Sequence, residues 1–95
     1  MSIARNDIDF LNYERDVLIY MFRYCLGRKT YAVSTAVEII WYNWNRLYTR
    51  DRALIHKEIL EHFQMFGVKP NDIDYKEWSK ILKLSVQGDS NDKDN

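Results

Sequence analysis

The chain has 95 residues, with 14 basic and 14 acidic side chains that give a net charge of zero, and 46% of its residues are hydrophobic. This length predicts one domain that buries a single core without disulfides or a metal. The zero balance argues against a general polyanion binder and equally against an acidic DNA mimic. The sequence begins without an apolar signal segment and has no run approaching the ~20 apolar residues that span a bilayer. The single cysteine fits the reducing cytoplasm.

Apolar side chains at helical spacing predict an all-α fold, a compact bundle of about four helices. The predicted helices cover residues 7–26, 34–48, 50–66 and 74–86. Short connections between them favour antiparallel neighbours. The predicted domain covers residues 1–87. Residues 88–95 form an acidic tail without apolar side chains, which predicts disorder because no burial offsets the entropy of ordering.

Glycines and capping residues predict where these helices begin and end. Helices commonly end on a glycine with left-handed backbone, and three of the patterns are followed by one, at Gly27, Gly67 and Gly88. Asn6 or Asp7 is expected to cap the first helix. Two capping boxes are expected to begin the second and fourth helices, and they pair Thr35 with Glu38 and Asp74 with Glu77.

Catalytic chemistry has little support in the sequence. No glycine-rich phosphate loop, dinucleotide-binding turn or H-E-x-x-H zinc motif occurs. The nearest approach to a metal cluster is His56, Glu58, Glu61 and His62, but a di-metal bundle needs Glu-x-x-His on two helices. Cys25 lies on the apolar face of the first helix and is expected to be a small buried residue. We therefore predict no enzyme activity, no cofactor and no metal.

Nucleic-acid binding is one alternative. A helix-turn-helix could use the Tyr48–Thr49 turn and place the third helix in a groove, with its first residues against the bases. The expected contacts are then Arg50, Arg52, His56 and Lys57. Against this, Glu58 and Glu61 follow on the same helix, and the turn lacks the common glycine. A solvated helix face of mixed charge explains the same residues.

Protein binding is the function that the sequence favours. Residues 23–57 hold seven basic side chains against two acidic ones, a net charge of +5. Aromatic residues make up 15% of the chain, and aromatics and arginine dominate binding hot spots. The predicted partner-binding residues are Arg23, Tyr24, Arg28, Lys29, Tyr31 and Tyr42. Two alternatives stay open, that these aromatics complete the core or that they join copies of the chain in a homo-oligomer.

The run from Tyr24 to Val33 (YCLGRKTYAV), with Trp44 and Leu47 downstream, resembles small proteins carried by phages and prophages. The likeness covers about residues 18–78. It transfers no catalytic or binding residues, and it implies a setting, the cytoplasm of a host cell. Such proteins often bind and inhibit or regulate a host protein that serves defence, replication or transcription. An anti-CRISPR role is one such activity.

Overall fold

The computed structural model describes residues 13–28 and 31–87 and confirms the all-α fold over them. Its elements are the α-helices α2 (Arg15–Cys25), α3 (Tyr31–Tyr42), α4 (Thr49–Phe66) and α5 (Ile73–Leu82), and the 3-10 helix η2 (Trp44–Arg46). No strand occurs in these two ranges. The tail predicted to be disordered, residues 88–95, lies outside the described residues. No helix of the described part is long and apolar enough to cross a membrane.

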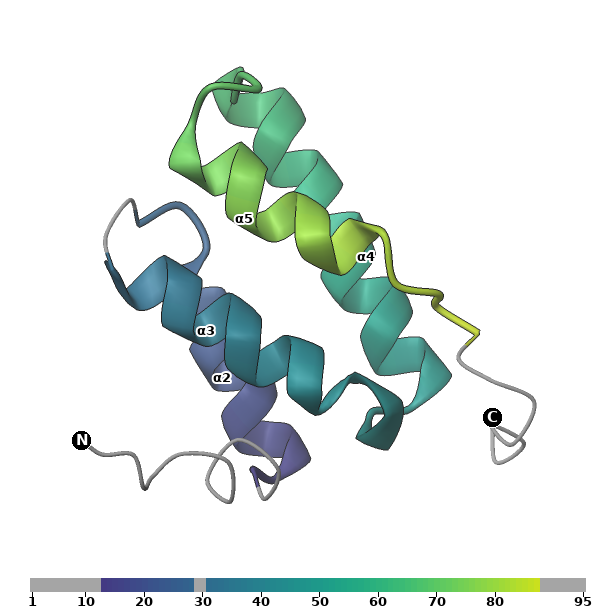
Figure 1. Cartoon of the computed structure of the whole chain (residues 1–95). Coiled ribbons are helices and arrows are strands. Elements are labelled where there is room, and N and C mark those ends of the chain that lie inside the picture. The colour runs from purple at the N-terminus through teal and green to yellow at the C-terminus, as the bar shows by residue number, and fades with distance from the viewer. Residues whose placement is uncertain (1–12, 29–30, 88–95) are drawn as a thin grey trace.

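The central helix is α3, which packs against α2 on one side and α5 on the other, while α5 also packs against α4. Figure 1 shows α4 and α5 running antiparallel through the short connection between them. The core fills the space that the helices share. At its centre the edge of one ring meets the face of the other in the Phe22–Trp78 pair, with centroids 5.4 Å apart. The other apolar side chains with no more than 1% exposure are Leu18, Val33, Ile40, Ile55, Ile59 and Ile81.

The predicted ends of the third helix are confirmed within one residue, and those of the other helices are partly wrong. Gly67 ends α4 with left-handed backbone (φ +59°), as expected. The first helix does not run unbroken from residue 7, because Glu14 is extended (ψ 157°) and α2 begins after it. Asn6 and Asp7 lie outside the described residues.

Neither expected capping box forms. The second helix, α3, begins at Tyr31, so Thr35 lies inside it rather than at its cap. The fourth helix, α5, begins at Ile73 behind Asp72, and Asp74 is fully buried instead of capping the helix. A capping pattern describes only local hydrogen bonding, and at Asp74 a contact with another helix determines where the carboxylate lies.

Asn43 ends α3 before the expected residue 48. Its backbone N–H is shared between the carbonyls of Ile39 and Ile40, at 3.1 Å from each. The side-chain amide of Asn43, which is fully buried, also donates to the Ile39 carbonyl at 2.8 Å. This competition for the last helical acceptors turns the chain into η2.

The buried guanidinium of Arg52 joins η2 to the segment after α5. It donates to the carbonyls of Trp44 (3.0 Å), Asn45 (3.4 Å) and Val86 (3.0 Å). The indole N–H of Trp44 adds a hydrogen bond to the Ser85 carbonyl at 2.8 Å. These bonds fix the chain beyond the last α-helix against the rest of the fold.

Candidate binding surface

After α2 the chain turns a corner at Gly27, which has φ +91°, while the helix itself ends at Cys25 because Leu26 is extended (ψ 122°). The backbone N–H of Arg28 then donates to the Cys25 carbonyl at 3.0 Å. The end of α2, the end of α4 and the start of α5 meet around a pocket of about 500 Å³, which we call the corner pocket. Its lining includes Arg23, Tyr24 and Arg28 from the end of α2, His62 and Phe66 from α4, and Asp74 from α5.

Arg28 is held against Tyr24 by two contacts. Its Nε–H donates to the Tyr24 carbonyl at 2.6 Å, and its guanidinium carbon lies 4.3 Å from the centroid of the Tyr24 ring. Tyr24 in turn stacks on Tyr20, with centroids 6.2 Å apart and ring planes 20° apart. The three side chains form an exposed stack along α2, so the guanidinium of Arg28 has a defined orientation at the mouth of the pocket.

Arg23 stands at another edge of the pocket and pairs with Glu58 of α4. Its Nη2 lies 2.9 Å from Oε2 of Glu58 and its Nε lies 3.4 Å from Oε1. The hydrogen bond to Glu58, together with the charge of that carboxylate, raises the pKa of Arg23, which stays a cation. Because both side chains are partly exposed, the pair contributes little to stability and mainly fixes the position of Arg23.

His62 and Asp74 form the inner wall of the pocket. Nε2 of His62 lies within hydrogen-bonding distance of Oδ2 of Asp74, at 3.1 Å, and the Asp74 side chain is fully buried. Oδ1 of Asp74 has no hydrogen-bond partner among the described residues. The His62 ring also packs on Phe66, with centroids 4.9 Å apart, and a Cβ at Gly27 would lie 3.0 Å from its Cε1. His62 therefore joins all three elements that meet at the corner.

A histidine oriented by a buried carboxylate also occurs in hydrolytic active sites, where it activates a nucleophile. Among the described residues that line the corner pocket there is no serine, threonine or cysteine. Cys25 is buried in the core, as predicted, and burial raises the pKa of its thiol, which disfavours the reactive thiolate. Within the described residues, no group of three or more His, Cys, Asp or Glu side chains could hold a metal ion.

The predicted partner-binding residues do not form one surface. Arg23, Tyr24 and Arg28 share the corner pocket, whereas Tyr42 lies at the far end of α3. Lys29 lies outside the described residues, and so does the side chain of Tyr31. The length of α3 therefore separates Tyr42 from the corner.

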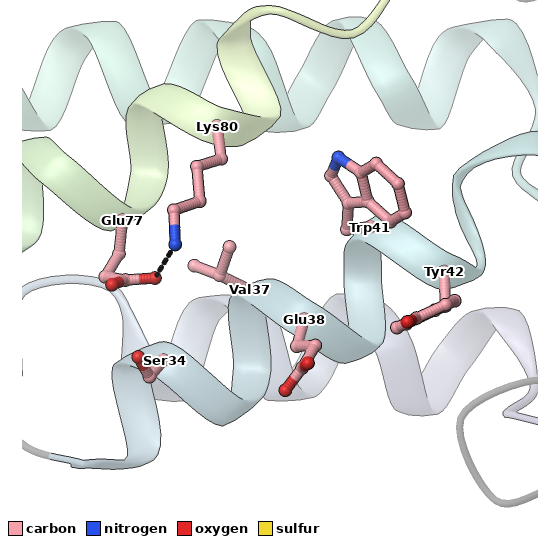
Figure 2. Close-up of a pocket in the computed structure, with 7 residues that line it drawn as sticks. All are labelled: Ser34, Val37, Glu38, Trp41, Tyr42, Glu77 and Lys80. Atoms are coloured by element: carbon pink, nitrogen blue, oxygen red, sulfur yellow. Dashed lines mark hydrogen bonds and ion pairs between the residues drawn. The ribbon is translucent and has the colours of Figure 1, made fainter. Parts of the chain in front are cut away.

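Tyr42 belongs instead to a groove of about 340 Å³ between α3 and α5, shown in Figure 2. Trp41 and Tyr42 pack edge to face at one end, with centroids 5.4 Å apart, and both side chains are about half exposed. Across the groove, Nζ of Lys80 pairs with Oε1 of Glu77 at 3.1 Å. The groove is a second exposed aromatic site, and the cation beside it already has an acidic partner.

The residues expected to contact nucleic acid divide between the surface and the interior. Arg50 and Lys57 are exposed, and the guanidinium of Arg50 lies 5.0 Å from the centroid of the Tyr48 ring. Arg52 is only 1% exposed, because it donates to interior carbonyls, so its expected place on an open face is wrong. His56 is half-buried, with Nε2 3.0 Å from the Ile81 carbonyl.

Sequence reasoning did not place His62, Phe66 and Asp74 in the site. They come from elements that follow the corner by 35 residues or more in the chain, and only the tertiary fold brings them to it. The spacing of His62 and Phe66 was a local signal for part of the site. The two residues are one helical turn apart just before the helix-ending Gly67, so their side chains share one face at the end of that helix. None of the protein-family models, curated proteins or solved structures compared with this chain matches it.

Proposed function

We propose that this chain is a non-enzymatic protein-interaction module that binds its partner through the corner pocket. The observation that carries the proposal is the composition of the pocket wall. Tyr24 is 53% exposed and Phe66 is 67% exposed, and they lie beside Arg23 and Arg28 around one concavity. Exposed aromatics and arginines gathered around a pocket are typical of binding hot spots.

The proposal also names a class of partner, and the resemblance to phage proteins supports that choice. A host protein is the expected partner, and inhibition or regulation of that protein in the host cytoplasm is the expected result. Inhibition of a host defence system, an anti-CRISPR activity among others, falls within this class.

The proposal is tested by capturing proteins from a bacterial lysate with matched variants of the chain. One variant carries Tyr24→Ala and Phe66→Ala, which remove the exposed aromatics of the corner pocket. The control carries Trp41→Ala, which removes an equally exposed aromatic from the groove between α3 and α5. Thermal unfolding of each variant verifies that it is folded.

Proteins that the wild type captures should be lost from the corner variant and kept by the Trp41→Ala control. Retention of all captured proteins by a folded corner variant would refute the corner pocket as the interface. Loss confined to the Trp41→Ala control would assign binding to the groove instead.

Nucleic-acid binding through α4 is supported less than protein binding, because two of its four expected contacts lie in or against the interior. A titration with random duplex DNA at decreasing salt tests this alternative, since phosphate contacts strengthen steeply at low ionic strength. We expect no saturable binding at about 20 mM salt. Binding that Arg50→Ala and Lys57→Ala together abolish would establish the alternative.

A further inference from the structure

The corner pocket has a polar half that is organised around Arg28. Its backbone N–H donates to the Cys25 carbonyl, and its Nε–H donates to the Tyr24 carbonyl. The face of its guanidinium packs on the Tyr24 ring. The two terminal amino groups of the guanidinium, Nη1 and Nη2, make no hydrogen bond within the described residues. A planar fork of donors in a fixed orientation matches the two oxygens of a carboxylate.

Arg28 differs in this respect from Arg15, Arg23 and Arg52, whose guanidinium groups donate to other protein groups. Arg15 pairs with Asp51, Arg23 pairs with Glu58, and Arg52 donates to carbonyls. Over residues 13–28 and 31–87, no carboxylate lies within ion-pairing distance of Arg28. In the same pocket the guanidinium of Arg23 faces Glu58, and the ring of His62 faces Asp74. Arg28 is therefore the cation at this pocket whose charge the described residues leave uncompensated.

The other half of the corner pocket is apolar. Leu26 and Val68 are half-buried in its lining, and the exposed ring of Phe66 stands beside them. Burial of this surface by a partner side chain would remove apolar area from water on both molecules. A ligand that fits both halves carries an acidic group and an apolar group within a few ångströms of each other.

We propose that the corner pocket recognises an acidic side chain of the partner protein, held by Arg28, together with a neighbouring apolar side chain that packs on Phe66. This inference rests on the proposed function and adds the chemistry of the partner. A nucleic-acid phosphate is the less favoured anion. Binding to a nucleic-acid backbone uses several cations along its path, whereas here the nearby Arg23 already faces Glu58.

The test uses a displayed library of random heptapeptides selected on the intact chain. Enriched peptides are synthesised, and their affinities are measured for the wild type and for Arg28→Lys, which keeps the charge and removes the fork. The control is Arg50→Lys, because Arg50 also lies over a tyrosine ring but belongs to a different surface. Phe66→Ala tests the apolar half.

We expect enriched peptides to carry Asp or Glu next to, or one residue from, an aromatic or aliphatic residue. Arg28→Lys should weaken their binding at least tenfold, or about 1.4 kcal/mol. The Arg50→Lys control should leave affinity unchanged. Replacing the acid of the peptide by its amide, Asn or Gln, should cause a similar loss on the wild type and little further loss on Arg28→Lys.

Enriched peptides without an acid, or equal binding to Arg28→Lys, would overturn the inference, as would a selection that enriches nothing. Peptides without an acid that still depend on Phe66 would leave the proposed function standing. Peptides that depend on neither Arg28 nor Phe66 would count against both. Duplex DNA binding that Arg28→Lys abolishes would assign this guanidinium to phosphate and also overturn the inference.

Discussion

Replacing Gly27 by alanine tests how closely the corner is packed. The backbone at Gly27 has φ +91°, beyond the small left-handed region that other residues tolerate, and the new Cβ would lie 3.0 Å from Cε1 of His62. His62 is poorly placed to move, because Nε2 is hydrogen-bonded to Asp74, whose other oxygen has no partner among residues 13–28 and 31–87. Gly67 supplies the matched control, since it too has positive φ but a Cβ there meets nothing within 4 Å.

The expected costs follow from these contacts. Gly67→Ala carries only the backbone penalty of a left-handed alanine, about 1 kcal/mol. Gly27→Ala adds the displacement of His62 from its rotamer, about 1 kcal/mol, and weakening of its hydrogen bond to Asp74, about 1 kcal/mol. We therefore expect Gly27→Ala to lower the free energy of unfolding by about 2–4 kcal/mol in total.

Urea denaturation of the two variants measures this difference. For a domain of this size, 1 kcal/mol corresponds to about 4–8 °C in melting temperature, so the two variants should be clearly separated. In a His62→Ala background the cost of Gly27→Ala should fall towards that of Gly67→Ala, because the obstructing ring is absent. Equal costs for Gly27→Ala and Gly67→Ala in the wild-type background would refute the reasoning.

Three further predictions concern the interior and the contacts between helices. Arg52→Met should lower the free energy of unfolding by about 3 kcal/mol or more, measured in urea, because three hydrogen bonds from a buried guanidinium to backbone carbonyls are lost, and Arg52→Lys should cost less. Burial raises the pKa of Cys25 above its ordinary value of 9.0, so the unfolded chain loses this proton first and stability falls as pH rises above 9.0. Melting temperatures at pH 8 and pH 10 should therefore drop less for Cys25→Ala than for the wild type, and an identical drop would contradict the burial argument. Asp51→Asn should lower the urea midpoint more than Glu58→Gln, because the carboxylate of Asp51 is 3% exposed and that of Glu58 is 26% exposed. The reverse order would show that burial does not decide the strength of the Arg15–Asp51 and Arg23–Glu58 ion pairs.

The sequence predicts the fold class and one helix almost to the residue. Apolar spacing, Gly67 and the segment before it define α4, because an amphipathic pattern and a helix-ending glycine are local signals. The turn of the chain at Gly27 is predicted for the same reason. Asn43 shows where local signals fail, since its buried amide takes a helical acceptor and ends α3 early. Nothing in the pattern marks which asparagine becomes buried.

The candidate site is predicted only for the part that one segment supplies. Arg23, Tyr24 and Arg28 lie within six residues of one segment. All three line the corner pocket. Arg52 shows the limit of this reasoning, because a basic residue near a helix start was assigned to the surface while its guanidinium lies inside. Asp74 is the converse case, an acid assigned to a helix cap that pairs with His62 instead. Both errors concern burial, which depends on packing between helices rather than on neighbours in sequence.

The hydrogen bonds from Trp44 and Arg52 to the carbonyls of Ser85 and Val86 have a consequence for where the chain can be shortened. The last α-helix ends at Leu82, and a truncation there would appear harmless if helices alone defined the domain. Such a truncation would delete both acceptors, so the indole N–H of Trp44 and Nη1 of Arg52 would each lose a hydrogen bond. The minimal folding unit therefore extends at least to Val86, and its boundary is determined by two backbone oxygens in a segment without regular secondary structure.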